Sequence, residues 1–168
     1  MSDEDGGLAW GHINVNVSDL DRSIAFYELL GFAVLFPGIP YLDVEQGPVP
    51  REIPEPGASA LGLEPSTQGR GCIMQLGKGF PMLDLTDLSC SDAASPLKTR
   101  DQGIVRICLA SRNLAGDYKR LVEAGVEFLS APKPGKGSSA EIAVCKDPDG
   151  TLIELIELHL DRWSELVS

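Results

Sequence analysis

The chain contains two copies of one pattern, and this internal repeat restricts its fold more than any other feature of the sequence. Residues 10–32 read WGHINVNVSDLDRSIAFYELLGF, and residues 104–128 read IVRICLASRNLAGDYKRLVEAGVEF. A constant offset of 94 aligns the two copies without a gap, beginning with His12 on Arg106. Each copy predicts a strand, a helix and a second strand, because apolar residues alternate in the first part and then recur at helical spacing. The sequence therefore predicts two tandem modules of the same kind.

The ends of the two predicted helices carry residues that favour helix termini. Ser18 is expected to cap the first helix, and Ser111 or Asn113 the second, because short polar side chains accept hydrogen bonds from the free amides of a first turn. Gly31 and Gly125 follow the last apolar residues of the two helices. Glycine at this place readily takes the left-handed conformation that ends a helix.

Both copies are followed by a similar hairpin, but the first module is longer. GCIMQLGKGFPMLDLTDL ends the first module and AEIAVCKDPDGTLIELIEL ends the second, and these place Asp84 on Glu154 at an offset of 70. The first module therefore holds about 24 extra residues, which fall between roughly residues 40 and 69 and include six prolines. Long inserts of this composition are either functional lids or loose loops. The sequence leaves two alternatives open. The insert could be a flap that covers a ligand cavity, or it could be a loose surface loop.

Strand alternation predicts which side chains share a face. Successive side chains of a strand point to opposite sides, so the apolar residues of the first and last strands of each module should pack against the helices. The polar residues between them then share the opposite face. From the four strands in chain order, these are His12, Asn14 and Asn16; Asp84 and Thr86; Arg106 and Cys108; and Glu154.

The segments GHINVNVSDLDRSIAFYELLGF and KDPDGTLIELIE resemble the vicinal-oxygen-chelate superfamily, which includes glyoxalases, bleomycin-resistance proteins and extradiol dioxygenases. The resemblance implies an α+β fold in which two tandem βαβββ modules form two curved mixed sheets around a cavity. The whole chain, residues 1–168, would form one such domain. Module one would span about 8–90 with the insert at about 40–69, module two about 101–158, and a short helix would follow at about 159–167.

The resemblance also implies a set of ligand positions. Metal-dependent members place four ligands on the first and last strands of each module, for a divalent ion such as Zn, Ni, Mn or Fe. Carried over by position, these are His12, Asp84, Arg106 and Glu154. Arginine is permanently charged and has no lone pair to offer, so Arg106 cannot be a ligand. His12, Asp84 and Glu154 would leave a weaker site with three ligands.

Three interpretations of Arg106 are open. Its guanidinium could replace the metal between the carboxylates and contact a ligand. It could form an ion pair that only braces the sheet. Its side chain could also be displaced from the site while a metal binds to His12, Asp84 and Glu154.

Two functional hypotheses follow from the resemblance. The first is a lyase or isomerase acting on a small, oxygen-rich and anionic molecule, with Glu154 as base and His12 as its polar partner. An extradiol dioxygenase is disfavoured, because it needs a histidine where Arg106 stands. The alternative is a non-catalytic protein that sequesters a drug or antibiotic, as bleomycin-resistance proteins do. In either case the expected ligand contacts are Asn14, Asp84, Thr86, Arg106 and Cys108.

Composition excludes several other classes. The net charge of −11, from 14 basic and 25 acidic residues, argues against nucleic acids and anionic membrane surfaces as partners. None of the four cysteines is spaced as CxxC, which argues against zinc knuckles and thioredoxin-type motifs. The acidic start MSDEDGGLAW lacks the apolar segment of a secretory signal, so a cytoplasmic location is expected. The resemblance allows a homodimer.

Overall fold

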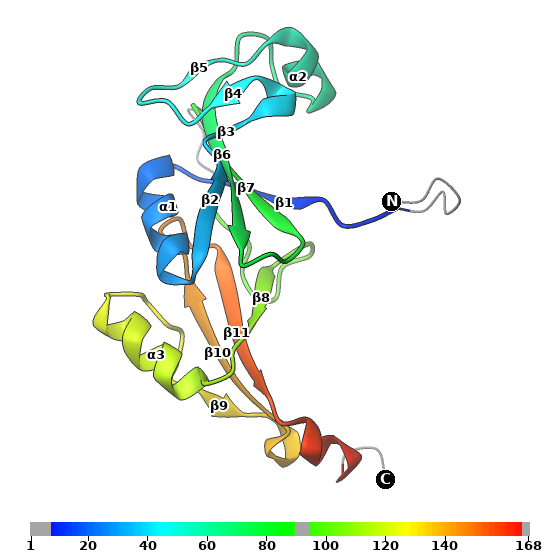
Figure 1. Ribbon diagram of the computed structural model, residues 1–168, viewed down its shortest axis with the longest axis vertical. Helices are drawn as coiled ribbons and strands as arrows, with labels where there is room; N and C mark the ends of the chain where they lie inside the picture. The colour runs from blue at the N-terminus through cyan, green and yellow to red at the C-terminus, as the bar shows by residue number, and fades with distance from the viewer. Residues whose placement is uncertain (1–7, 90–94, 166–168) are drawn as a thin grey trace. The chain divides into compact units, whose positions relative to one another are not determined.

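The computed structural model describes residues 8–89 and 95–165. The chain divides into two compact units, Met1–Ala93 and Ala94–Ser168 (Figure 1). Both mix helices with curved sheets, as the resemblance predicted for an α+β fold. Within the described residues, no helix is long and apolar enough to cross a membrane.

The first unit is built on a five-stranded sheet. Strands β1, β7, β6 and β2 are neighbours in that order, and β5 pairs with β6. β1 runs parallel to β7, and the other pairings in this sheet are antiparallel. The elements are β1 His12–Asn16, α1 Leu20–Leu29, β2 Phe32–Phe36, β3 Gly38–Ile39, η1 Pro40–Leu42, β4 Val44–Glu45, β5 Arg51–Glu52, α2 Glu55–Ala60, β6 Gln68–Leu76 and β7 Met82–Leu88.

The second unit repeats the arrangement with four strands. The order in its sheet is β8, β11, β10 and β9, and β8 runs parallel to β11. The elements are β8 Arg106–Ala110, α3 Leu114–Glu123, β9 Lys133–Pro134, η2 Lys136–Ser138, β10 Ala140–Lys146, β11 Leu152–Leu158 and η3 Leu160–Glu165. The strand expected directly after the second helix begins later, at Lys133, and Phe128 forms only an isolated bridge to Cys145.

The two units use the same strand register, which confirms the internal repeat. In the first unit Asn14 pairs with Asp84, and in the second Cys108 pairs with Glu154. The pairs on either side of these also correspond under the offsets of 94 and 70. Of the additional strands, β4 and β5 lie in the insert and β3 immediately precedes it. Eight strands therefore form the repeated framework that the sequence predicted.

Side-chain burial alternates along β1, whereas in the middle of β7 the polar and the apolar side chains are both buried. In β1 and just beyond it, Val15 and Val17 are buried, while Asn14 and Asn16 are exposed. In β7, Leu83 is buried on the apolar side of the sheet. Helix α1 buries residues from Leu20 to Tyr27 and contacts both β2 and β7. The apolar faces of the strands thus form the core together with the helices, and the polar faces are left for a site.

The helix termini confirm most of the expected signals and correct one. Gly31 and Gly125 both have positive φ, at 95° and 86°, as the C-terminal positions require. Asn113 caps the second helix by accepting a hydrogen bond from the amide of Gly116. Ser18 is not the cap of α1, because Asp19 occupies that position and accepts from the amide of Arg22.

The insert is folded, with short strands, turns and a helix. Its apolar residues form a small core together with residues of β3 and β6. Partly buried apolar side chains pack against this core. The fully packed members are Ile39, Leu42, Val44, Ile53, Ala58 and Ile73. A loose surface loop is therefore the wrong description of residues 40–69, which contain η1, β4, β5 and α2. That the insert covers a cavity stays a prediction.

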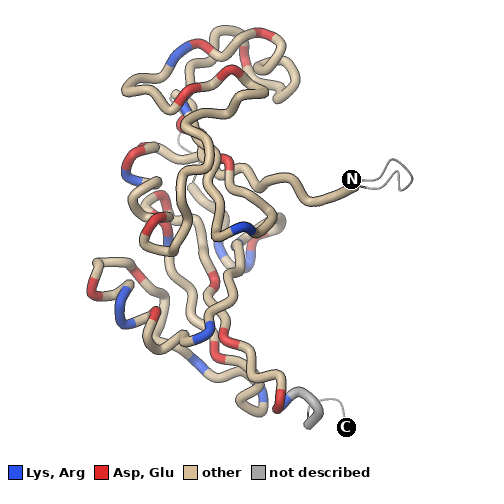
Figure 2. Tube along the Cα trace, viewed as in Figure 1, with Lys and Arg blue, Asp and Glu red and all other residues tan. Residues whose placement is uncertain are grey.

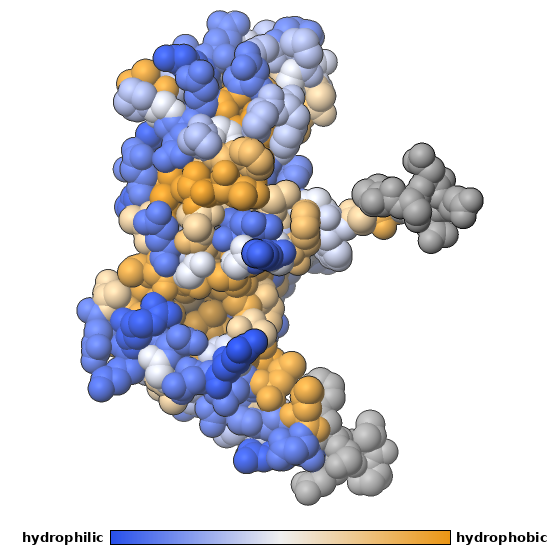
Figure 3. Space-filling model, viewed as in Figure 1, coloured by the Kyte–Doolittle hydropathy of each residue, from blue (hydrophilic) through white to orange (hydrophobic). Residues whose placement is uncertain are grey.

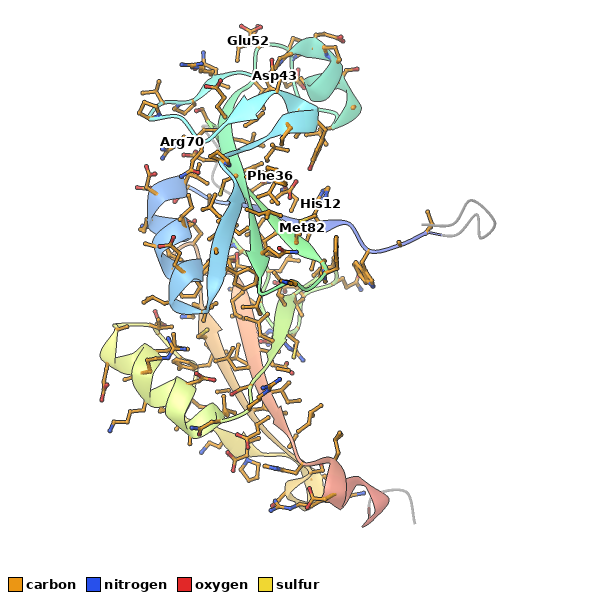
Figure 4. The ribbon with its side chains drawn as sticks, in the orientation of Figure 1. His12, Phe36, Asp43, Glu52, Arg70 and Met82 are labelled. Carbon is orange, nitrogen blue, oxygen red and sulfur yellow. The ribbon has the colours of Figure 1, made fainter. Side chains whose placement is uncertain are left out.

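A buried arginine anchors the insert to the first sheet. Arg70, on β6, is 8% exposed and lies near the base of the insert (Figure 4). It donates hydrogen bonds to Asp21 at 2.8 Å, to Asp87 at 3.0 Å and to the carbonyl oxygen of Gly47 at 3.4 Å. Acidic partners therefore compensate a cation that burial alone would make unfavourable. Such a guanidinium joins α1, β7 and the insert through one group.

Charge is distributed along both units. Figure 2 shows acidic residues throughout the trace with fewer basic residues among them, as the net charge of −11 requires. Apolar side chains also reach the surface near β2 (Figure 3), where Leu35 is 42% and Phe36 is 47% exposed.

Candidate functional site

Each unit carries a carboxylate at the corresponding place in its last strand, and each carboxylate has a hydrogen-bond donor of its own. In the first unit, Asp84 lies with His12 and Tyr41, which we call the module-one cluster. In the second unit, Glu154 lies with Arg106 and Cys108, which we call the module-two cluster. We describe the two clusters separately.

His12 and Asp84 come from neighbouring parallel strands. His12 lies beside Met82, its partner in the register (Figure 4), and Asp84 is two residues further along β7. The His12 Nε2 lies 3.7 Å from Asp84 Oδ2. The Asp84 side chain is 1% exposed, whereas 41% of the His12 side chain is exposed. A buried carboxylate therefore has a partly exposed imidazole beside it.

Tyr41 completes the module-one cluster from the insert. Its hydroxyl donates a short hydrogen bond to Asp84 Oδ2 and lies 3.5 Å from His12 Nε2. Its ring stacks on the imidazole, with centroids 5.8 Å apart and planes at 22°. Burial, followed by the hydrogen bond to Asp84, raises the pKa of Tyr41 above its usual range. The phenol is therefore a neutral hydrogen-bond donor at physiological pH.

One oxygen of the Asp84 carboxylate has no such partner. Asp84 Oδ1 is buried, and it accepts no hydrogen bond from the residues that the structure describes. Buried polar atoms are nearly always hydrogen-bonded, so each exception requires an explanation. The cluster has unused capacity to accept a hydrogen bond.

A row of polar side chains continues from the module-one cluster along the same face. The hydroxyl oxygen of Thr86 lies 3.1 Å from Asn14 Oδ1 and 2.6 Å from Asn16 Oδ1. Asn14 also donates to Asn16 Oδ1 at 2.9 Å. The strand face thus brings together Asn14, Asp84 and Thr86 with His12, as alternation predicted. Thr86 is 5% exposed, whereas Asn14 is exposed.

The module-two cluster is an ion pair with a thiol beside it. Arg106 Nε donates a short hydrogen bond to Glu154 Oε2. The thiol of Cys108 lies 3.5 Å from Glu154 Oε1 and is placed to donate to it. The Arg106 side chain is 39% exposed and that of Glu154 is 14% exposed. Both oxygens of Glu154 therefore have partners within the module.

The cysteines differ in exposure. Cys72 and Cys145 are fully buried, as expected for small apolar side chains, whereas Cys108 is exposed. The pKa of Cys108 is raised to about 11, first by partial burial and then by the charge of Glu154 and the hydrogen bond to it, while Arg106 acts against them. Cys108 is thus a protonated thiol at physiological pH and a weak nucleophile.

The two carboxylates are engaged by donors of their own units. Within residues 8–89 and 95–165, no group of three His, Cys, Asp or Glu side chains is placed to hold an ion. The carboxylate of Asp84 accepts a hydrogen bond from the hydroxyl of Tyr41, and that of Glu154 is paired with a guanidinium. The expected metal roles of His12, Asp84 and Glu154, and the catalytic roles of His12 and Glu154, stay predictions.

Sequence reasoning missed Tyr41. The residue lies in the insert between Pro40 and Leu42, outside both repeated segments, so neither the repeat nor strand alternation pointed to it. Only its chemistry was a signal, since Tyr41 is the sole aromatic residue between 40 and 69.

Comparisons with known proteins agree with this architecture. Residues 9–155 match the family described as the glyoxalase/bleomycin resistance protein/dioxygenase superfamily. No curated protein matches the chain significantly.

Similar solved structures include a glyoxalase family protein from Bacillus cereus, with 17% identity, a TM-score of 0.71, and 94% of this chain and 99% of that chain covered. A superfamily member from Sphaerobacter thermophilus has 21% identity and a TM-score of 0.55 over 89% of this chain and 98% of that one. A glyoxalase I mutant from Zea mays has 23% identity and a TM-score of 0.59 over 86% of this chain but 43% of that one.

At these identities the solved structures establish a shared fold, and the match over residues 9–155 establishes the family. The repeated modules, their common register and the match together lead to one assignment. The chain belongs to the glyoxalase/bleomycin resistance protein/dioxygenase superfamily.

Proposed function

We propose that this protein binds a small, oxygen-rich anion on the polar strand face of its second unit, with Arg106 as the principal contact and without a resident metal. The observation that carries the proposal is the Arg106–Glu154 ion pair, which sets a guanidinium beside the carboxylate. Membership of the superfamily is consistent with a small-molecule ligand.

Arg106 has unused capacity to bind an anion. A guanidinium carries five N–H donors, and the ion pair with Glu154 engages only the one on Nε. Within the described residues, the terminal nitrogens of Arg106 form no hydrogen bond, and 39% of the side chain is exposed. The two terminal nitrogens form a fork that matches a carboxylate or a pair of vicinal oxygens. The ligand class that fits is therefore a carboxylate, enolate or phenolate.

The same geometry favours binding over proton abstraction. A general base needs an oxygen that can reach the proton it removes. Glu154 Oε2 is held by Arg106, and Oε1 faces the thiol of Cys108. A ligand-sequestering protein is therefore the function that we propose, and a lyase or isomerase with Glu154 as base stays a prediction from the sequence.

The test compares anions with neutral molecules of the same shape. Oxalate and salicylate should raise the melting temperature of the wild-type protein, whereas oxamide and salicyl alcohol should not. Arg106→Met keeps much of the side-chain volume and removes the charge, and it should abolish the shift. Arg51→Met removes a charge that is 68% exposed in the first unit and should leave the shift unchanged. Equal shifts in wild type and Arg106→Met would reduce Arg106 to a structural brace.

A further inference from the structure

The module-one cluster contains a buried carboxylate, Asp84, that is only partly hydrogen-bonded. Asp84 is almost fully buried, and one of its oxygens has no partner in the part of the chain that the structure describes. A carboxylate that served only to brace the sheet would have both oxygens satisfied. The other oxygen of Asp84, Oδ2, lies against the imidazole of His12 and the phenol of Tyr41.

The phenol of Tyr41 engages the Asp84 oxygen that a cation shared with His12 would bind. Two ligands about 2.0–2.2 Å from one tetrahedral ion lie roughly 3.4 Å apart. The His12 Nε2 and Asp84 Oδ2 atoms are separated by 3.7 Å, which is close to that spacing. The hydroxyl of Tyr41 lies 3.5 Å from this nitrogen and hydrogen-bonds to this same oxygen. An ion and this hydroxyl would therefore compete for the same oxygen, Asp84 Oδ2.

The insert keeps Tyr41 in this position. Ile39 and Leu42, which flank Pro40 and Tyr41 in the chain, are buried in the small core that the insert forms with β6, and Asp43 turns the chain with a φ of 53°. Tyr41 itself is 58% exposed, so burial of its ring does not account for its orientation. The contacts that fix the side chain are the hydrogen bond to Asp84 and the stacking on His12.

We propose that Tyr41 is a specificity-determining residue that keeps divalent cations off the His12–Asp84 pair. Its hydroxyl donates a hydrogen bond to the oxygen of Asp84 that a cation would otherwise bind. The cluster can therefore bind a ligand only through hydrogen bonds. The proposal rests on module-one geometry and does not depend on anion binding at Arg106.

Removing the hydroxyl tests the proposal with Ni²⁺ as the probe. Tyr41→Phe keeps the ring and its stacking on His12 but leaves the buried carboxylate without its donor. Titration calorimetry should show that this variant binds Ni²⁺ about tenfold or more tightly than wild type, an effect of the size that groups around metal ligands exert. Adding Asp84→Asn to Tyr41→Phe should remove the gain.

The histidines report where the ion binds. The chain has two, His12 and His159, so an NMR spectrum of the imidazole nitrogens contains only two rings to assign. Paramagnetic Ni²⁺ should broaden the His12 signal of Tyr41→Phe at concentrations that leave it sharp in wild type, while His159 serves as the internal reference. Broadening of His159 first would place the ion elsewhere and overturn the proposal.

A second substitution of Tyr41 and a test of folding guard against a variant that fails to fold. Tyr41→Leu provides a second variant without the hydroxyl, and circular dichroism identifies which variants are folded. A gain in Ni²⁺ affinity in any folded variant, lost with Asp84→Asn, supports the role of the hydroxyl. Affinity equal to that of wild type in the folded variants, or a gain that survives Asp84→Asn, overturns it.

Discussion

Replacing Arg106 and Glu154 separately and together should reveal how much the ion pair contributes to stability. Exposed ion pairs contribute about 0–1 kcal/mol, whereas breaking a buried pair costs about 3–5 kcal/mol. This pair is intermediate, because 39% of the Arg106 side chain and 14% of the Glu154 side chain are exposed. Solvent screening at the exposed guanidinium places the cost of Arg106→Met at about 1–2 kcal/mol.

The double-mutant cycle isolates the interaction itself. Urea unfolding of wild type, Arg106→Met, Glu154→Gln and the double variant gives four free energies of unfolding. The coupling energy between the two residues should be about 1 kcal/mol, since they are in direct contact. In thermal unfolding, Arg106→Met should lower the melting temperature by roughly 2–8 °C, given about 2–4 °C per kcal/mol for a domain of this size.

Two results of the cycle would refute this reasoning. A coupling energy within about 0.3 kcal/mol of zero would show that the two side chains do not interact in solution. A cost for Arg106→Met above about 4 kcal/mol would show that the guanidinium is fully buried, and an anion from solution could not then reach it.

The remaining predictions concern the thiol of the module-two cluster and the buried arginine of the first unit. Iodoacetamide at pH 8 should alkylate Cys108 slowly, because its pKa is raised to about 11 and the thiol stays protonated below that value. Glu154→Gln should speed the reaction and Arg106→Met should slow it, because the carboxylate raises the pKa of Cys108 and the guanidinium lowers it. Peptide mass spectrometry measures both alkylation rates. If both variants changed the rate in the same direction, the contacts of Cys108 would be contradicted. Arg70→Met should cost about 3 kcal/mol in urea unfolding because it leaves aspartates without their cation, whereas Arg51→Met should change stability by less than about 1 kcal/mol. Similar costs for these two variants would show that the Arg70 cluster does not hold the insert.

The framework of the fold followed from the sequence because the repeat is visible without a structure. The offsets of 94 and 70 that align the modules are reproduced in the strand register, where Asn14 pairs with Asp84 as Cys108 pairs with Glu154. Alternation also placed the polar residues on one face of each pair of strands. These are local patterns, and local patterns are what sequence reasoning interprets best.

The parts that the sequence did not predict depend on contacts distant along the chain. Tyr41 reaches Asp84 across 43 residues, and nothing in the pattern of the insert indicates this contact. Ser18 and Asp19 both suit a helix cap, and the conformation of the chain before α1 selected Asp19. A single domain with both clusters facing one cavity, a homodimer and a cytoplasmic location stay predictions.

The central claim is that Asp84 and Glu154 each accept a hydrogen bond from a donor of the chain itself, in place of a metal ion. The metal content of the purified protein tests this claim most directly. Elemental analysis after growth with added Zn²⁺, Ni²⁺, Mn²⁺ and Fe²⁺, together with calorimetric titration of wild type and Arg106→His, measures it. The account predicts far less than one ion per chain in wild type and tighter Ni²⁺ or Zn²⁺ binding in Arg106→His, where an imidazole replaces the guanidinium. One tightly bound divalent ion per wild-type chain would contradict it.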